Sequence, residues 1–256
     1  MQRSPQEIAA LLIRAQDTAT PLPESERQTM TLAEAYAVQS AIRDEKARLG
    51  HRVVGKKIGF TGRAMRALFK VDEPDYGNLF SDQMFPQGGA VAASRFVAPK
   101  VEGEIAFVLK RDLAGPGVTP ADVLAATRGV MACIEFVDFR WGFQATILDS
   151  IADNASCGGF ALGSKLVPLK ALDLRHEGMF VEKNGDLVNS GAGVEVMGDP
   201  LNAVAWLANT LAVHGDGLRA GDIILSGSLT AAVPVQAGDA VTVSFATLGS
   251  VSVRFT

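Results

Sequence analysis

The chain has 256 residues, of which 48% are hydrophobic and 20% charged, and its net charge is −4. This composition supplies enough apolar side chains for a packed core and argues against a disordered chain. The acidic balance, with no basic cluster interleaved with aromatic residues, argues against nucleic acid as a partner.

The sequence also indicates the compartment. Two cysteines, Cys133 and Cys157, give neither a disulfide framework nor a zinc spacing, which suits a reducing cytoplasm. The start of the chain is too short and too polar for a signal peptide, and no apolar run reaches the roughly 18 residues that span a bilayer. We therefore expect a soluble, cytoplasmic protein without a membrane partner.

Two helices are expected at the N-terminus. Ser4 is suited to cap a helix that has Pro5 at its first position and continues to about residue 15. Thr31 and Glu34 have the spacing of a capping box, which predicts a longer helix over 31–49. Neither helix carries an obvious chemical group, so both are expected to pack on the main body or on a neighbouring subunit.

We divide the chain into a helical lead-in, 1–50, and a main domain, 51–256. The main domain begins with a predicted strand over 52–61 that contains Lys56 and Lys57 between glycines. Adjacent strand residues face opposite ways, so at most one lysine can share a face with another group of interest. Lys56 is expected to be a solvated edge residue.

A polar loop follows this strand. A short helix is predicted over 62–69, and residues 71–77 are punctuated by proline and glycine. Loops of this kind often carry function, so we expect this one, which contains Asp75, to be a lid over a site.

Three acidic residues lie in two apolar strands. Glu102 and Glu104 share one face of the strand over 101–109, about 7 Å apart along the backbone, and would repel unless a cation or a proton intervenes. Glu135 lies within an apolar run, where a lone carboxylate is costly unless it is paired or binds a metal. Together they suggest a site for Mg²⁺ or Mn²⁺. The alternatives are a solvent-facing Glu-x-Glu edge and an arginine partner for Glu135.

The rest of the chain predicts mixed elements. Arg140 follows the Glu135 strand and is expected to pair with Asp138 or with a substrate carboxylate. A turn over 226–230, rich in small hydroxyl residues, suits a carboxylate or an oxo group, although an ordinary turn has the same composition. Helices are predicted over 119–127, 146–152 and 199–213, an Asn-Gly hairpin over 180–188, and strands over 222–226, 240–245 and 251–255.

Two common kinds of site are not supported. Neither GxGxxG nor GxxxxGK[ST] occurs, which argues against a nucleotide cofactor. His51, His176 and His214 fall in loops or at the ends of elements, so a Ser-His-Asp hydrolase has little support.

Six stretches in one order resemble the 2-keto-4-pentenoate hydratase (2-hydroxypenta-2,4-dienoate hydratase) family. That family is related to 4-oxalocrotonate decarboxylases and to the catalytic domain of fumarylacetoacetate hydrolases. The resemblance runs from roughly Met30 to the C-terminus. The matching stretches are residues 55–61, 73–77, 101–109, 134–140, 152–156 and 224–230.

The resemblance implies roles for particular residues. It places Mg²⁺ or Mn²⁺ on Glu102, Glu104 and Glu135, and a catalytic lysine at Lys57. Asp75 falls in the family's E-P-D-[YF]-G loop and is expected to be catalytic. We expect Arg140 and Ser228 to bind the substrate.

The resemblance further implies an α+β fold, a mixed β-roll of the fumarylacetoacetate hydrolase C-terminal-domain type with flanking helices, assembled into homo-oligomers. Two departures from the family pattern are expected to reshape the pocket. One is Phe60-Thr61-Gly62, where Leu-Thr-Ser is frequent, and the other is Phe139, where a small or polar residue is common.

The implied activity is metal-dependent addition of water to a 2-hydroxy-2,4-dienoate, giving a 4-hydroxy-2-oxo acid in aromatic catabolism. The alternative is decarboxylation of a 4-oxalocrotonate-type 2-oxo acid, which needs a charge partner for a second carboxylate. Hydrolysis of a 1,3-diketone would need a general base, usually histidine. A catalytically silent partner subunit would not need the three carboxylates and Lys57.

Overall fold

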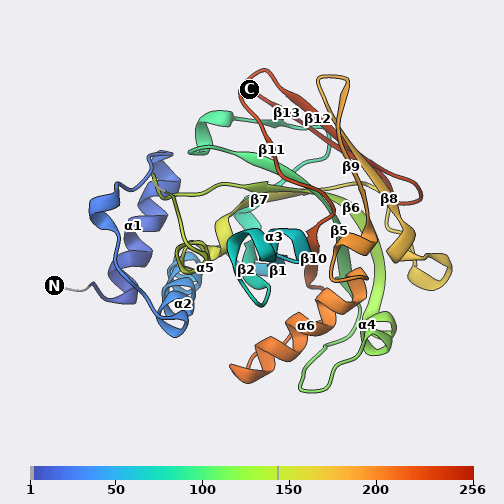
Figure 1. The fold of residues 1–256 in the computed structure, drawn as a ribbon, viewed down its shortest axis with the longest axis horizontal. Coiled ribbons are helices and arrows are strands. Elements are labelled where there is room, and N and C mark those ends of the chain that lie inside the picture. The colour runs from blue at the N-terminus through green and yellow to red at the C-terminus, as the bar shows by residue number, and fades with distance from the viewer. Residues whose placement is uncertain (1–2, 143) are drawn as a thin grey trace.

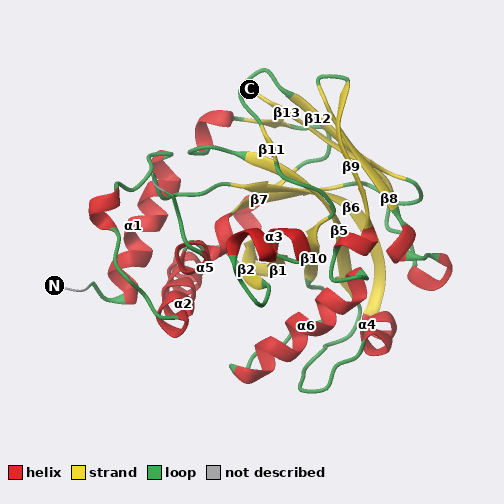
Figure 2. Ribbon diagram, in the orientation of Figure 1, coloured by secondary structure: helices red, strands yellow, loops and turns green. Residues whose placement is uncertain are grey.

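Two β-sheets form the centre of the molecule, and helices flank them (Figures 1 and 2). A computed structural model of the chain describes residues 3–142 and 144–256. Within these residues the first sheet has eight strands, in the order β2-β1-β10-β5-β6-β7-β3 with β11 beside β5. The second has five, in the order β4-β13-β12-β8-β9. The α+β expectation is therefore confirmed.

The strands of the first sheet are β1 (Val53–Gly59), β2 (Asp75–Phe80), β3 (Met84–Phe85), β5 (Lys100–Leu109), β6 (Thr127–Val137), β7 (Cys157–Leu162), β10 (Ile223–Ser228) and β11 (Val233–Pro234). Those of the second are β4 (Ala90–Val91), β8 (Gly178–Lys183), β9 (Asp186–Ala192), β12 (Ala240–Phe245) and β13 (Gly249–Phe255). The α-helices are α1 (Pro5–Thr18), α2 (Leu32–Arg48), α3 (Arg63–Phe69), α4 (Pro120–Ala126), α5 (Ile147–Ala152) and α6 (Pro200–Val213). No helix in the described part of the chain is both long and apolar enough to cross a membrane.

The N-terminal helices α1 and α2 lie together at one end of the molecule, beside α5 (Figure 1). Ser4 caps α1 as expected and also forms a capping box with Glu7, and the capping box expected at Thr31 begins α2. Their buried residues share one apolar cluster with Phe80, Trp141 and Ile151 of the main body. The lead-in thus packs on the rest of the chain, and a domain boundary at residue 50 stays a prediction.

Strands β5 and β6 pair antiparallel along most of their length and present different chemistry on their two faces. One face packs on the second sheet. A Cβ atom at Gly103 would lie 2.8 Å from Met179 Sδ and 2.9 Å from Val243 Cγ1, so a larger residue there would force these side chains to shift. The neighbouring Glu102 and Glu104 point to the other face, because side chains alternate along a strand.

Strand β1 lies inside the first sheet, between β2, which is antiparallel to it, and β10, which is parallel. Lys57 pairs with Gly77 on one side and Leu225 on the other. This position has a consequence for the loop expected over 71–77. Residues from Asp75 onward form β2 and are buried, so a mobile lid at Asp75 is wrong. Pairing with β1 outweighs the local turn-forming composition.

Most other elements are found where the sequence predicts them. The β8–β9 hairpin turns at Asn184 and Gly185, whose φ angles of 56° and 88° are those of a type I′ turn. Helix α6 begins after the Asp199 cap, and the three C-terminal strands are β10, β12 and β13. The finer description of the sheets as a β-roll stays a prediction.

Candidate metal centre and active site

The three acidic residues meet on one face of β5 and β6. The strand register places Glu102 directly opposite Glu135, and Glu104 follows two residues along the same face. One carboxylate oxygen from each residue lies within 4.8 Å of the other two. Glu104 and Glu135 are completely buried, and among the described residues no arginine pairs with any of the three. Both alternatives to a metal site, a solvent-facing edge and an arginine partner, are therefore wrong.

Several oxygens of this triad have no hydrogen-bond partner among the residues that the structure describes. They are Oε1 of Glu104 and both carboxylate oxygens of Glu135, whereas Oε2 of Glu104 accepts a hydrogen bond from the Gly227 amide at 2.8 Å. Burial and the negative charge of Glu135 raise the pKa of Glu102 to about 7. Burial and both neighbours hold the pKa of Glu104 well above its usual range. Buried carboxylates with free lone pairs are the ligands of a hard divalent cation, so these residues fit Mg²⁺ or Mn²⁺.

Lys57 is the lysine that faces the triad. Its Nζ lies 3.2 Å from Oε1 of Glu135 and donates a hydrogen bond to the Ala155 carbonyl oxygen at 3.2 Å. Burial lowers the pKa of this ammonium group, but the four surrounding carboxylates outweigh burial and raise it overall. Lys57 therefore stays charged and offsets part of the negative charge of the triad.

The neighbouring Lys56 lies on the other face, and the expectation that it is a solvated edge residue is wrong. It is 6% exposed, and its Nζ donates a hydrogen bond to Asn78 Oδ1 at 2.8 Å. The Asp216 carboxylate lies 3.6 Å away. The reason is that β1 is an interior strand, and that Asn78 of the paired strand β2 and Asp216 lie on the same face as Lys56.

Asp75 is brought beside Lys57 by the pairing of β2 with β1. It lies opposite Gly59, and a Cβ atom at Gly59 would overlap Asp75 Oδ1 and lie 3.4 Å from Lys57 Nζ. Both carboxylate oxygens of Asp75 are buried without a well-formed hydrogen bond. Burial raises the pKa of Asp75, Lys57 lowers it and Glu135 raises it again, to about 6. A buried carboxyl group that titrates near neutrality is suited to proton transfer.

A turn with left-handed backbone angles lies next to Lys57. Asn154, Ala155 and Ser156 have φ angles of 53°, 50° and 55°, which are unfavourable for residues other than glycine. The Asn154 side chain holds the turn, because it accepts from the Asn78 amide at 2.8 Å and donates to the Asn78 carbonyl at 2.9 Å. The turn thereby directs the Ala155 carbonyl at Lys57. These residues lie in the stretch 152–156 that resembles the hydratase family, but the sequence predicted no role for them.

A cavity of about 520 Å³ opens beside these groups. Lys57, Asp75 and Glu102 line it, as does Ser228, whose hydroxyl donates to the Thr230 carbonyl at 2.7 Å. Helix α3 borders it with exposed apolar side chains. None of the three histidines, all of which are described, is part of the lining, so a histidine base for hydrolysis of a 1,3-diketone is not in place.

Arg140 is not part of this cavity. Its Nε donates to Asp153 Oδ1 at 2.7 Å, and its other nitrogens donate to the carbonyl oxygens of Asp138, Asp153 and Cys157. The Asp138 carboxylate instead accepts backbone amides of residues 97 and 98. The expected side-chain pair of Arg140 with Asp138 is wrong, and four of the five N–H donors of the guanidinium group are used within the chain.

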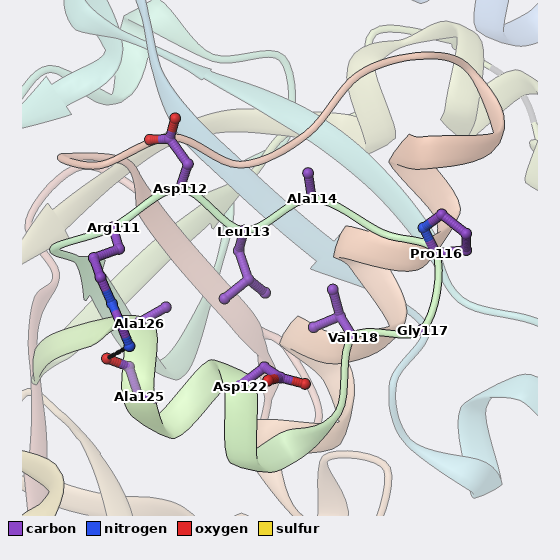
Figure 3. A pocket seen from close by; sticks show the side chains of 10 residues that line it. All are labelled: Arg111, Asp112, Leu113, Ala114, Pro116, Gly117, Val118, Asp122, Ala125 and Ala126. Carbon is purple, nitrogen blue, oxygen red and sulfur yellow. Dashed lines mark hydrogen bonds between the residues drawn. The ribbon is translucent and has the colours of Figure 1, made fainter.

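A second hollow, of about 400 Å³, lies between residues 111–118 and helix α4 (Figure 3). Its charged groups are used within the chain. Arg111 donates to the Ala125 carbonyl at 2.6 Å, Asp112 accepts the Ala220 amide at 2.7 Å, and Asp122 closes the capping box of α4. No cluster of unpaired polar groups converges there within the described residues, so we assign the site to the cavity at Lys57.

The sequence is similar to those of known proteins. Residues 43–256 match the fumarylacetoacetate (FAA) hydrolase C-terminal family. A 2-hydroxyhexa-2,4-dienoate hydratase of Comamonas testosteroni is 42% identical over 247 residues, which cover 95% of this chain and 93% of that protein. A 4-oxalocrotonate decarboxylase of Pseudomonas putida is 44% identical over 227 residues, covering 88% of this chain and 86% of that one.

The similarity extends to a solved structure. That of 4-oxalocrotonate decarboxylase from Pseudomonas putida G7, complexed with magnesium and adipate, superposes with a TM-score of 0.95 at 40% identity. The match covers 98% of this chain and 97% of that one.

Proposed function

The chain belongs to the fumarylacetoacetate hydrolase family, and from this premise we propose that it is a metal-dependent hydratase. It adds water to a 2-hydroxy-2,4-dienoate of the 2-oxo-4-pentenoate type and forms a 4-hydroxy-2-oxo acid in aromatic catabolism. The observation that carries the proposal is the triad of the half-buried Glu102 and the buried Glu104 and Glu135, with Lys57 beside it, at the inner end of a cavity of about 520 Å³. Relatives named hydratases support the reaction class.

The residues supply a metal site and a proton pathway. A divalent cation held by the three carboxylates would polarise the 2-oxo group of the substrate as a Lewis acid. Lys57, charged and 3.2 Å from Glu135, holds the negative charge that a substrate carboxylate brings into this buried site. Asp75, with a pKa of about 6, accepts or donates the proton that moves as the dienol becomes the oxo acid.

Other groups position the reacting partners. The Gly227 amide fixes Glu104, and the left-handed turn fixes Lys57 through the Ala155 carbonyl. Ser228 lies on the lining, where its hydroxyl can turn from Thr230 toward an oxo-acid oxygen. We propose that Lys57 and Asp75 are catalytic and that Ser228 binds substrate. Arg140 has no part in this proposal.

A decarboxylase is the second candidate, because two proteins named 4-oxalocrotonate decarboxylase are 44% and 45% identical to the chain. The discriminating experiment is incubation of the metal-loaded protein with 2-hydroxypenta-2,4-dienoate and, separately, with 4-oxalocrotonate. We expect loss of the dienol absorbance with the first substrate, abolished by a chelator and restored by Mn²⁺. Release of carbon dioxide from the second substrate, with no hydration of the first, would reverse the assignment. Failure to respond to metal would point to a silent partner subunit.

We also propose a cytoplasmic homo-oligomer whose two sheets form the family's β-roll. Cys133 and Cys157 are buried free thiols, as a reducing compartment allows. The β8–β9 hairpin leaves Phe180 and Leu187 42% and 66% exposed, a surface that a second copy can cover. Light scattering on the purified protein measures the oligomeric state directly, and a monomer at micromolar concentration would refute this part.

A further inference from the structure

The cavity has two chemically different ends. Its inner end is charged and buried, since Lys57 and Asp75 are 4% and 2% exposed. Its outer end is apolar and open, because Met65 and Phe69 of α3 line it and are 42% and 48% exposed. A substrate whose oxo-acid end lies at the triad therefore directs its far end toward α3.

No cationic side chain lines that far end among the described residues. Among the described residues that line the cavity, Lys57 is the only cation. Arg66 lies on α3 outside the lining, and its Nη1 donates to the backbone carbonyl oxygens of Phe60 and Thr61 at 2.9 and 2.8 Å. This guanidinium group therefore holds the entry to α3 in place and is not aimed into the cavity.

The far end carries a negative charge instead. Glu195 lies on the lining and is exposed. Asn189, which also lines the cavity, donates a hydrogen bond from its side-chain amide to the Ala231 carbonyl oxygen at 2.8 Å. A second carboxylate at this end would lie among the apolar side chains of α3 and be repelled by Glu195, a like charge.

We propose that Glu195 and the apolar face of α3 select substrates whose far end is uncharged and apolar, such as an alkyl-substituted 2-hydroxydienoate, over those with a second carboxylate. The inference rests on the proposed function for the direction in which the substrate lies. It identifies Glu195 and the apolar face of α3 as the groups that make this cavity bind a hydratase substrate more tightly than a 4-oxalocrotonate-type diacid.

The test is a binding measurement that needs no turnover. Two six-carbon ligands, 2-oxohexanoate and 2-oxoadipate, differ only in a terminal methyl or carboxylate group. We expect isothermal titration calorimetry of the Mg²⁺-loaded protein to give a Kd about tenfold lower for 2-oxohexanoate. Equal or tighter binding of 2-oxoadipate would overturn the proposal, whether or not the protein hydrates a dienoate.

Variants locate the effect. Glu195→Gln should reduce the ratio of the Kd for 2-oxoadipate to the Kd for 2-oxohexanoate several-fold. Met65→Lys should reduce this ratio further or make 2-oxoadipate the tighter ligand. The matched control is Leu68→Lys, which adds the same charge to the same helix at a residue that is 72% exposed and off the lining. Glu24→Gln, an exposed acid near the N-terminal helices, controls for net charge. Equal effects of Met65→Lys and Leu68→Lys would show that only the overall charge of α3 matters, and would refute the assignment.

Discussion

Glu104→Gln gives the sharpest test of the metal centre. The change removes one negative charge, and the side-chain oxygen of glutamine can still accept the Gly227 amide that lies 2.8 Å from Glu104. Two unit charges no more than 4.8 Å apart repel by about 3.5 kcal/mol at an effective dielectric constant of about 20. Because the raised pKa of Glu104 lets a proton relieve part of this repulsion, we expect the metal-free variant to be more stable than the metal-free parent by about 1–3 kcal/mol at pH 8.

The assay is thermal denaturation at pH 8, with a chelator and then with Mg²⁺ or Mn²⁺. The parent should gain stability from the metal, and Glu104→Gln should gain little and lose metal-dependent turnover. Glu177→Gln is the matched control, because Glu177 is also buried but accepts hydrogen bonds from the Thr247 amide and hydroxyl at 2.7 and 2.6 Å. That substitution should destabilise the protein with or without metal. If metal-free Glu104→Gln were less stable than the parent, or if Mg²⁺ stabilised both equally, the triad would not be a metal site.

Three further predictions concern the lysines and pH. Lys57→Met should lower kcat by a factor of roughly 10²–10⁴. Mg²⁺ should still raise the melting temperature of this variant, because the three carboxylates of the triad remain. A variant whose melting temperature does not rise with Mg²⁺ would contradict this prediction. A folded-state pKa of about 7 at Glu102 exceeds its unfolded value, so the metal-free protein loses stability as pH rises from about 4.5 to 7. Mg²⁺ affinity should rise over the same range with release of protons, which calorimetry in two buffers measures. Lys56→Ala should lower the free energy of unfolding, measured in urea, by about 1–3 kcal/mol, because Asn78 and Asp216 lose their buried partner. An unchanged free energy of unfolding would show that Lys56 behaves as a solvated edge residue.

Features set by a few consecutive residues were predictable from sequence. The helix cap at Ser4 and the capping box at Thr31 form as expected, and the Asn184-Gly185 turn closes its hairpin. Each depends on hydrogen bonds or φ angles within four residues, so no distant part of the chain can easily override it. The alternation of a strand likewise fixed that Glu102 and Glu104 share a face.

The meeting of these two carboxylates with Glu135 depends on more than alternation. Spacing within β5 left a solvent-facing edge open, and only the pairing of Glu102 with Glu135 across two interior strands excludes it. Resemblance to the hydratase family anticipated this triad. The geometry supplies the reason, since the opposite face of the strand is occupied by the second sheet at Gly103.

By itself, then, the sequence determined the helix starts, the hairpin turn and the face on which each strand carboxylate lies. Only the tertiary structure decided that Lys56 is buried, that Asp75 opens a buried strand, and that Arg140 pairs with Asp153. The physical reason is common to all three. Burial and pairing of a charged side chain depend on which strands and turns become its neighbours, and those neighbours come from segments far away in the chain.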